Sequence, residues 1–355
     1  MNRRVTHIAS KHLGVGIPPK NAEKARILLI KSNLLDLNRK PVKTKDFVFF
    51  PIIDHTSIPE VLHEFKFKIQ TQFFPNRVLH EPIEEQLQKE FPTVNWDQIT
   101  LKFDQIGNIA VLKLDPTNTT TIFRKRAGSE ILSRHSKLVA VLNKNEPVSG
   151  TKRVYPIEYL AGERIFQTWH QEYGVFIFVD LKRAYFNPRL TEEHHRVAMC
   201  VKSNEKILDM FTGVGSFALH CAKVTDCKVV AIDINPYAIF ALQNSVNRNK
   251  LHGIIYPIIG DSRFILRKQH YFDRVIINLP QISRNFISYA AKLVKKGGIL
   301  TFYQFIPKSI NPKLKIRELI ETELPNINSY KELYFKVGRE VSPSRVQINV
   351  DLQII

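Results

Sequence analysis

The chain has 355 residues, of which 44% are hydrophobic and 24% charged, and this length predicts two or three domains that each bury a core. Lys and Arg total 52 against 33 Asp and Glu, a formal net charge of +19, which favours a polyanionic partner, above all nucleic acid. No apolar run reaches the length of a membrane span, so the composition argues against a membrane protein built from helices.

The number and spacing of the cysteines indicate the compartment in which we expect the protein. There are only three, Cys200, Cys221 and Cys227, and none forms a C-x-x-C pair or joins a His/Cys cluster with zinc-ligand spacing. We therefore expect no disulfide framework and no metal site. The basic N-terminal stretch faintly resembles a transit peptide, but it lacks the apolar core of a secretory signal, so we predict a cytoplasmic protein.

The first part of the chain predicts a small α+β module. Residues 21–32 have helical spacing of apolar side chains, and residues 46–53 form a strand interrupted by Pro51. Polar and proline residues then suggest a loop, so we place the first module at residues 1–58. The next stretch, residues 65–79, is basic and aromatic, and an amphipathic helix follows at residues 83–91.

A second α+β module is predicted over residues 65–178, as a compact mixed or barrel-like unit. Its apolar pattern is strand-like between residues 99 and 123, and three consecutive cations follow at residues 124–126. Further strands are predicted at residues 138–142, 154–159 and 174–181.

From residue 189 onward, strands alternate with helices. This alternation is the pattern of a parallel sheet covered by helices, so the third domain, residues 179–355, is predicted to be α/β and Rossmann-like. No internal repeat or low-complexity segment is evident.

A glycine turn in this domain indicates a nucleoside cofactor. The first strand ends at Asp209 and continues as D-x-F-x-G-x-G to Gly215, where backbone can approach a ligand closely. A second strand ends at Asp233, which is placed to accept hydrogen bonds from ribose hydroxyl groups. Because the turn is not G-x-G-x-x-G, it favours a ligand without a pyrophosphate, and we predict S-adenosylmethionine.

Two later strands also end in polar residues. Asp261 follows the third strand and can accept from an adenine amino group, whereas Asn278-Leu279-Pro280 follows the fourth. Methylases of exocyclic amino groups commonly carry N/D-P-P and an aromatic residue here. Gln281 stands in that place instead, which argues modestly against amino-group chemistry.

Candidate bases precede the first strand of the sheet. Residues 185–190 read as a loop over the cofactor site, and Glu192 and Glu193 follow at the start of a helix. Either acid can serve as a general base, or its negative charge can simply stabilise the N-terminus of the helix. His194 and His195 compete for that role, although adjacent histidines are usually solvated surface residues.

These motifs together resemble the archaeal and eukaryotic tRNA guanine-37 N1-methyltransferases, with their wyosine-modifying archaeal relatives, from about residue 154 to residue 298. The matching stretches are Leu160-Ala161-Gly162-Glu163, Tyr185-Phe186-Asn187-Pro188-Arg189-Leu190, Asp209 to Gly215, Ala231-Ile232-Asp233-Ile234-Asn235-Pro236 and Ile277-Asn278-Leu279-Pro280. The resemblance implies a class I S-adenosylmethionine-dependent methyltransferase domain preceded by two smaller RNA-binding modules, the first of which recognises tRNA shape.

The resemblance also assigns roles to residues. It implies that Arg153 stabilises negative charge on the guanine O6 and that Glu193, eight residues after Tyr185, is the general base. The residues expected to hold the target base are Tyr185, Arg189, Asn278 and Pro280. Those expected to bind the cofactor are Asp209, Phe211, Gly213, Gly215, Asp233, Ile234, Asp261, Ser262 and Asn278.

Three alternatives stay open. One is carbon methylation of the wyosine precursor 4-demethylwyosine at the same tRNA position, alone or as a dual activity. Another is transfer of the aminocarboxypropyl group of the same cofactor, and the third is a catalytically silent tRNA-binding protein. For each of them we expect tRNA as the partner, no membrane association and a monomer.

Overall fold

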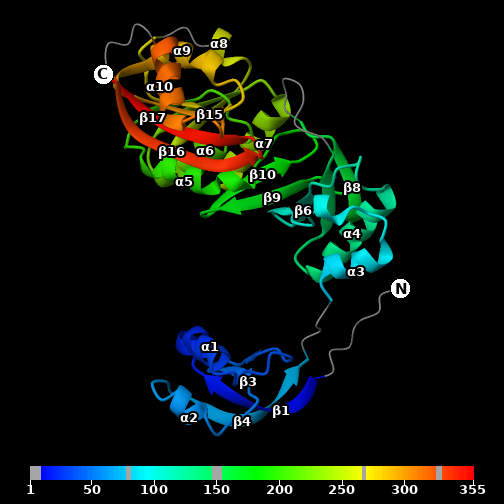
Figure 1. Ribbon diagram of the computed structural model, residues 1–355. Helices are drawn as coiled ribbons and strands as arrows, with labels where there is room; N and C mark the ends of the chain where they lie inside the picture. The colour runs from blue at the N-terminus through cyan, green and yellow to red at the C-terminus, as the bar shows by residue number, and fades with distance from the viewer. Residues whose placement is uncertain (1–8, 77–80, 146–153, 266–268, 325–329) are drawn as a thin grey trace. The chain divides into compact units, whose positions relative to one another are not determined.

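The computed structural model describes residues 9–76, 81–145, 154–265, 269–324 and 330–355. The chain divides into two compact units, Met1–Gln86 and Leu87–Ile355, which are described one after the other (Figure 1). Within the described ranges, no helix has the length and apolar character that crossing a membrane requires.

The first unit is an antiparallel sheet packed against helices. Its elements are β1 (Ala9–Ile17), η1 (Pro19–Asn21), α1 (Ala22–Lys31), β2 (Val42–Lys43), β3 (Val48–Pro51), α2 (Ile58–Val61) and β4 (Lys68–Pro75). The strands lie in the order β2-β3-β1-β4. Val15 and Ile17 on β1 are buried in one core with Ala25 and Leu29 on α1. The predicted helix and strand of this module are confirmed.

The prediction that the first module ends at residue 58 is wrong. β4 pairs with β1 from Ala9 opposite Pro75 to Gly16 opposite Lys68. Without β4, that edge of β1 would present a row of unpaired backbone groups. The basic and aromatic segment that we assigned to the middle module therefore completes the first sheet.

The second unit begins with a smaller mixed sheet. Its elements are α3 (Ile83–Glu90), η2 (Trp96–Gln98), β5 (Asp104–Ile106), β6 (Ile109–Leu112), α4 (Thr121–Arg134), β7 (Ala140–Lys144) and β8 (Ile157–Gly162). The strand order is β5-β6-β7-β8, and only β6 and β7 are parallel. The predicted mixed α/β character of this module is confirmed.

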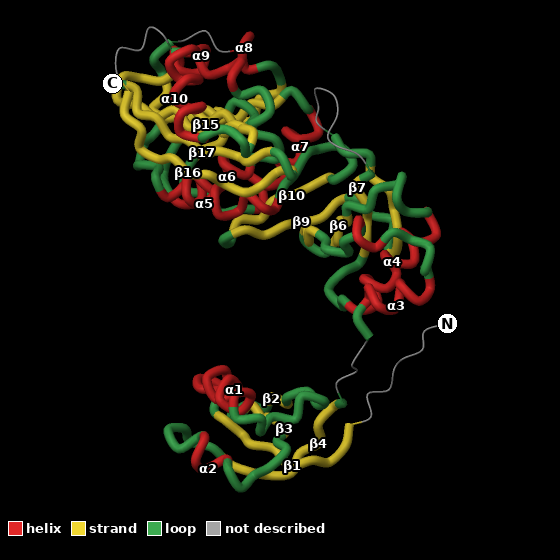
Figure 2. Tube along the Cα trace, in the orientation of Figure 1, coloured by secondary structure: helices red, strands yellow, loops and turns green. Residues whose placement is uncertain are grey.

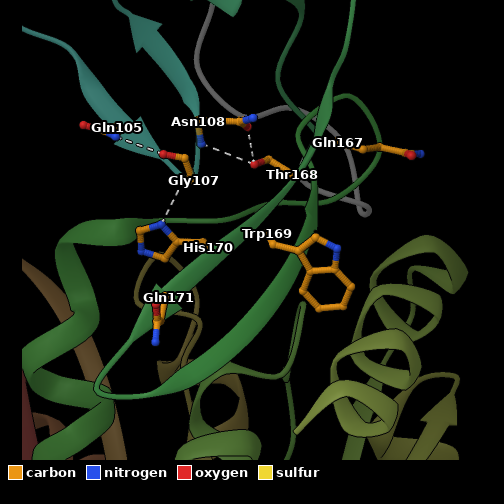
Figure 3. A pocket seen from close by; sticks show the side chains of 8 residues that line it. All are labelled: Gln105, Gly107, Asn108, Gln167, Thr168, Trp169, His170 and Gln171. Atoms are coloured by element: carbon orange, nitrogen blue, oxygen red, sulfur yellow. Dashed lines mark hydrogen bonds between the residues drawn. The ribbon is translucent and has the colours of Figure 1, made fainter. Parts of the chain in front are cut away.

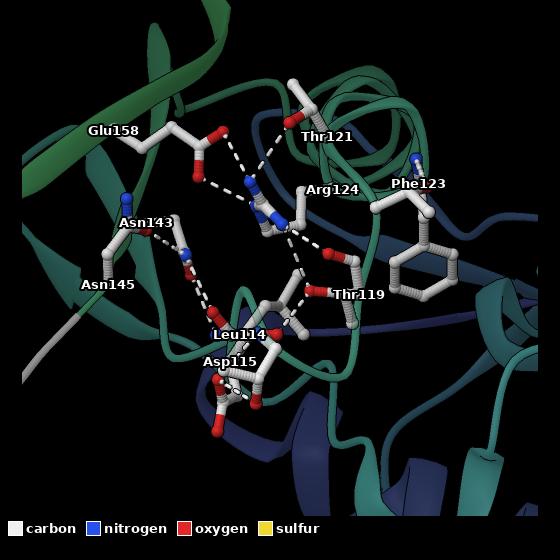
Figure 4. A network of polar contacts seen from close by, with 11 residues as sticks. Leu114, Asp115, Thr119, Thr121, Phe123, Arg124, Asn143, Asn145 and Glu158 are labelled. Carbon is white, nitrogen blue, oxygen red and sulfur yellow. Dashed lines mark hydrogen bonds and ion pairs between the residues drawn. The ribbon is translucent and has the colours of Figure 1, made fainter.

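Buried polar contacts hold α4 on this sheet (Figure 4). Arg124 is 6% exposed, and its guanidinium donates to both carboxylate oxygens of Glu158 on β8, at 2.7 and 3.1 Å. Arg126 pairs with Glu90 and Glu130. Two of the three consecutive cations in the sequence are therefore engaged within the protein, and Lys125 alone of the three has an exposed side chain with no such pair among the described contacts.

The rest of the unit is a seven-stranded sheet covered on both faces (Figure 2). The strand order is β13-β12-β11-β14-β15-β17-β16; β11 to β15 run parallel, and β17 and β16 are antiparallel to their neighbours. The strands are β11 (Lys206–Asp209), β12 (Lys228–Asp233), β13 (Ile254–Ile259), β14 (Phe272–Ile277), β15 (Val294–Pro307), β16 (Tyr330–Ser342) and β17 (Arg345–Ile354). The predicted parallel Rossmann-like sheet is confirmed.

Alternating side chains of the strands build two separate cores. On β11, Ile207 packs in the core with α6 and α7, whereas Leu208 packs in the core with α9 and α10. The helices are η3 (Pro188–Leu190), α5 (Thr191–Met199), α6 (Ser216–Val224), α7 (Pro236–Arg248), α8 (Ser262–Ile265), α9 (Arg284–Leu293) and α10 (Pro312–Glu323).

A hairpin, β9 (Gln167–Glu172) and β10 (Val175–Asp180), links the two sheets of this unit. On one side, the N–H of Gly107 donates to His170 Nδ1 at 3.2 Å. On the other side, the N–H of Phe178 donates to Ser245 Oγ on α7 at 2.8 Å. The predicted domain boundary between residues 178 and 179 is misplaced, because it cuts β10.

A cavity of about 770 Å³ lies where β9 meets the turn between β5 and β6 (Figure 3). The side chain of Thr168 donates to Asn108 at 2.7 Å across this junction. The other lining residues are Gln105, Gly107, Gln167, Trp169, His170 and Gln171. The wall is therefore rich in uncharged amide groups.

We expect residues 81–355, produced without the first sheet, to fold alone. The core of the first unit is formed by residues of that unit only, and the second unit has its own cores. A cooperative thermal transition followed by circular dichroism checks this expectation. A fragment without native helical signal would contradict the division.

Candidate active site

The carboxyl ends of four parallel strands meet at one edge of the large sheet. β11 lies between β12 and β14, so the connections leave it in opposite directions, which is where open α/β sheets bind ligands. Asp209 ends β11, Asp233 ends β12, Asp261 follows β13 and Asn278 follows β14. The structure thus brings together the four predicted polar strand ends.

The glycine turn has the backbone that the sequence predicts. Gly213 has φ 54° and Gly215 has φ 87°, a region that favours glycine. A Cβ on Gly215 would lie 2.2 Å from Leu242 Cδ1, so this glycine also permits the packing of α6 on α7. A Cβ on Gly213 would meet only the backbone oxygen of Tyr185, at 3.9 Å, so open space adjoins the turn.

Asp233 links this turn to β12. Its two carboxylate oxygens accept from the N–H of Gly213 and from the N–H of Asn235, both at 2.8 Å. These two hydrogen bonds orient the carboxylate at the end of β12, and its predicted contact with ribose hydroxyl groups stays a prediction. Ile234, the next residue, is 46% exposed, and its contact with the cofactor stays a prediction.

Asp209 is fully buried and incompletely paired. Thr212 donates to its Oδ2 at 2.7 Å, whereas Oδ1 is buried without a hydrogen-bond partner. Burial, with a smaller contribution from the negative charge of Asp233, raises the pKa of Asp209 to about 7. Ser262 Oγ, after β13, is likewise buried without a partner. Two unpaired buried polar atoms at this edge, one on β11 and one at the start of α8, fit a polar ligand.

Asp261 is engaged by a neighbouring cation. Arg263 donates to it, with the shortest contact at 2.6 Å, and this hydrogen bond lowers the pKa of Asp261 below its ordinary value. The carboxylate is therefore ionised at neutral pH. Its expected contact with an adenine amino group stays a prediction.

The turn after β14 is held against the sheet. The N–H of Phe305 donates to the backbone oxygen of Pro280 at 3.0 Å, and Pro280 is buried while Asn278 is half-buried. Phe211 packs edge-to-face on Phe286 of α9, with ring centroids 4.7 Å apart. These contacts fix the backbone on which the predicted base and cofactor contacts lie.

The loop before η3 lies over the glycine turn, as predicted. Tyr185 is half-buried, and its ring stacks on Tyr155 with centroids 5.7 Å apart. Arg189 donates to Asp104 on β5 at 2.8 Å, so it joins this loop to the smaller sheet. Contact of Tyr185 and Arg189 with the target base stays a prediction. Arg153 lies outside the described residues.

The structure distinguishes the two candidate glutamates. Glu193 is 7% exposed and accepts hydrogen bonds from Arg196 and from the hydroxyl group of Tyr303 on β15. Glu192 is exposed and accepts from Tyr173 at 2.6 Å. Of the two carboxylates, the one held in place by buried neighbours is therefore Glu193.

A cavity of about 300 Å³ adjoins Glu193. Its opposite wall comes from the last two strands, with Lys336 on β16 and with Gln347 and Asn349 on β17. Gln347 and Asn349 are almost fully buried, and the side-chain amide of Gln347 donates to Asn349 at 3.1 Å. Sequence reasoning missed these residues because no motif marks them.

The expectation that the adjacent histidines are solvated is wrong. His194 is 3% exposed, and its Nδ1 lies 2.8 Å from Glu172 Oε2, while His220 Nε2 lies 3.1 Å from the same oxygen. His195 stacks on Tyr173 at 3.9 Å. Burial lowers the pKa of His194, although Glu172 opposes this effect, so His194 is neutral and paired rather than a free base.

Glu172, His194 and His220 also have donor atoms close enough together for a metal ion. Burial alone would raise the pKa of Glu172, but hydrogen bonds from both histidines hold it well below its usual range. Because both imidazoles contact one carboxylate oxygen at hydrogen-bond distance, we interpret these three residues as a hydrogen-bonded group that connects β9, α5 and α6.

The substitution Asp209→Asn tests the buried carboxyl group. Because the pKa is higher in the folded protein, the folded state binds this proton more tightly than the unfolded chain, and this stabilisation is lost as the pH rises from 3.8 to about 7. We expect the Asn variant to melt above the wild type at about pH 8.5 and to lose that advantage at about pH 5. An equal difference at both pH values would contradict the buried, proton-binding carboxyl.

Comparisons with known proteins match family models to three parts of the chain. A family model of the TRM5/TYW2 methyltransferase domain matches residues 168–327, one of the TYW2 N-terminal domain matches residues 83–165, and one of the tRNA methyltransferase 5 N-terminal domain matches residues 14–60. The first model spans most of the hairpin of β9 and β10 and the parallel strands β11 to β15, the second spans the sheet of β5 to β8, and the third ends before β4 of the first sheet.

Two curated relatives are similar over most of the chain. The tRNA (guanine(37)-N(1))-methyltransferase Trm5b of Methanocaldococcus jannaschii is 32% identical over 307 residues, which are 85% of this chain and 89% of the relative. The tRNA 4-demethylwyosine(37)-methyltransferase Taw21 of Saccharolobus solfataricus is 30% identical over 260 residues, 73% of this chain and 94% of the relative.

Solved structures show the same fold. A complex of aTrm5 with tRNALeu has a TM-score of 0.69 and 28% identity, covering 97% of this chain and 100% of that one. Trm5 of M. jannaschii in complex with adenosine has a TM-score of 0.64 and 28% identity, covering 96% and 99%. On the strength of these matches, the chain belongs to the TRM5/TYW2 family of methyltransferases.

Proposed function

We propose that the protein transfers a methyl group from S-adenosylmethionine to N1 of the guanosine at position 37 of tRNA. The observation that carries the proposal is Glu193, a buried carboxylate at the wall of a cavity, in a chain that also has the complete cofactor edge. The Trm5b relative and the complex of aTrm5 with tRNALeu support this substrate.

The cofactor edge fits S-adenosylmethionine. The turn at Gly213 leaves room for close approach, and Asp233 ends the neighbouring strand β12, where it accepts from the ribose hydroxyl groups. The unpaired Oδ1 of Asp209 can accept from a polar group of the ligand. When bound here, S-adenosylmethionine supplies the electrophilic methyl group.

Glu193 supplies the base for the reaction. Guanine N1 carries a proton at neutral pH and is a poor nucleophile until that proton leaves. The N1–H bond breaks as the proton passes to a carboxylate oxygen of Glu193, and the freed electron pair of N1 forms the new bond to the methyl carbon. This bond replaces the one between the methyl carbon and the sulfonium sulfur, and the electron pair of the broken bond stays on sulfur. Negative charge grows on O6 meanwhile, and a guanidinium directed there, the role we propose for Arg153, stabilises it.

The direct test uses the purified protein with labelled S-adenosylmethionine. Transcripts of one tRNA carry G, A or inosine at position 37, and the nucleosides are identified after digestion. We expect 1-methylguanosine from the G37 transcript and no label in A37, because adenine carries an amino group in place of O6 and so lacks the oxygen on which a guanidinium would stabilise negative charge. Label in A37 but not in G37 would overturn the proposal.

A second candidate activity is carbon methylation of 4-demethylwyosine at the same position. The similarity to Taw21 over 73% of the chain favours keeping it. A tRNA that carries 4-demethylwyosine at position 37 distinguishes the two reactions in the same assay. Transfer to no substrate would instead indicate a tRNA-binding protein. Action as a monomer in the cytoplasm stays a prediction.

The substitution Glu193→Gln tests the base. It keeps the shape of the side chain but cannot take the proton, so turnover is expected to fall by about 10²–10⁴-fold with little change in cofactor affinity. Glu192→Gln is the control, because Glu192 is exposed and paired with Tyr173. Equal turnover of the Glu193 variant and the wild type would remove Glu193 as the base.

A further inference from the structure

We propose that Arg196 is the positioning residue of this reaction: it fixes the Glu193 carboxylate so that Oε2 is the oxygen that takes the proton. This inference rests on the proposed function. Arg196 lies three residues after Glu193 on α5, and no motif or resemblance marks it in the sequence.

The two oxygens of Glu193 have different partners. Oε1 accepts from Arg196 Nη2 at 2.7 Å, from Arg196 Nε at 3.1 Å and from the hydroxyl group of Tyr303 at 2.9 Å. Among the residues that the structure describes, Oε2 accepts only from Arg196 Nε, at 3.1 Å. Because Oε1 already has three donors, the lone-pair capacity that a proton needs is on Oε2.

Tyr303 adds a donor that keeps its hydroxyl proton at neutral pH. Its side chain is fully buried, and burial together with the charge of Glu193 raises its pKa well above the ordinary value. The phenol therefore keeps its proton and directs it at Oε1.

Arg196 is itself held by side chains of the last two strands, β16 and β17. Its Nη1 donates to Asp351 Oδ2 on β17 at 2.8 Å, and the guanidinium lies over the ring of Tyr334 on β16, 3.8 Å from its centroid. Burial by itself would lower the pKa of Arg196, but the hydrogen bonds to Glu193 and Asp351 raise this pKa above its ordinary value. The side chain therefore stays a cation. One guanidinium thus connects the base on α5 to two strands.

The same local geometry occurs at Glu23 and Arg26 on α1, where it is exposed. There Arg26 Nη2 donates at 2.7 Å and Nε at 3.0 and 3.2 Å, which almost repeats the distances at Glu193. The pair on α1 has side chains 70% and 40% exposed, whereas Glu193 and Arg196 are 9% and 20% exposed. An exposed pair of this kind contributes little to stability. Arg196 can position Glu193 because the pair is buried and because Asp351 holds the guanidinium through a second contact.

The test replaces Arg196 with Gln, Lys and Ala. We expect Arg196→Gln to lower the single-turnover rate by about 10- to 100-fold, because a base displaced by about 1 Å loses its alignment, with KM for tRNA and cofactor nearly unchanged. Arg196→Lys keeps the charge but not the planar two-donor contact, and should recover only part of the rate.

Rescue separates positioning from a structural role. Added guanidinium chloride should restore part of the rate of Arg196→Ala, and sodium chloride at equal ionic strength should not. Arg317→Gln is the matched control, because Arg317 forms an exposed helical pair with Glu321 on α10. Circular dichroism establishes that each variant is folded.

The outcomes are distinct. An unchanged rate for Arg196→Gln, or a rate loss that guanidinium cannot restore, would overturn the positioning role. Inactivity of both wild type and Arg317→Gln on the G37 transcript would instead contradict the proposed function.

Discussion

The parallel pairing of β11 with β12 on one side and β14 on the other is the constraint on which the site depends. It brings residues about 70 positions apart in the sequence, Asp209 and Asn278, to one edge of one sheet. The chain leaves β11 through a turn that only glycine accommodates at Gly213 and Gly215 without strain. The polar residues at the strand ends are therefore already in place in the free protein. Ligand binding then costs little conformational entropy at these residues.

Burial decides what each charged group does in this protein. The contacts of Glu193 with Arg196 resemble those of an ordinary surface pair, yet they lie within a layer bounded by β15, β16 and β17. Asp209 shows the opposite case, since within the described part of the chain no cation pairs with it and its pKa rises with burial. A buried carboxylate with a cation and one without it thus differ in how readily they hold a proton.

The sequence was sufficient where the chemistry is local. The strand-turn-helix at Asp209 and the helix start at Glu193 are short patterns with a direct structural meaning, and the sheet that carries them is as predicted. It was insufficient where the partner is remote: Tyr303 lies 110 residues from Glu193, and Asp351 lies 155 residues from Arg196. Arg196 itself could have been found, because residues three apart on a helix are neighbours. The boundary at residue 58 failed for the same reason, since strand pairing between β1 and β4 has no local signal.

The hairpin of β9 and β10 has a mechanical consequence. At one place it is hydrogen-bonded to the smaller sheet through His170, and at another to α5 and α6 through Glu172. These two residues stand two apart on the same strand, so their side chains lie on one face. A displacement of the smaller sheet relative to β9 would therefore also strain the contacts of β9 with α5 and α6, because one strand carries both sets of hydrogen bonds.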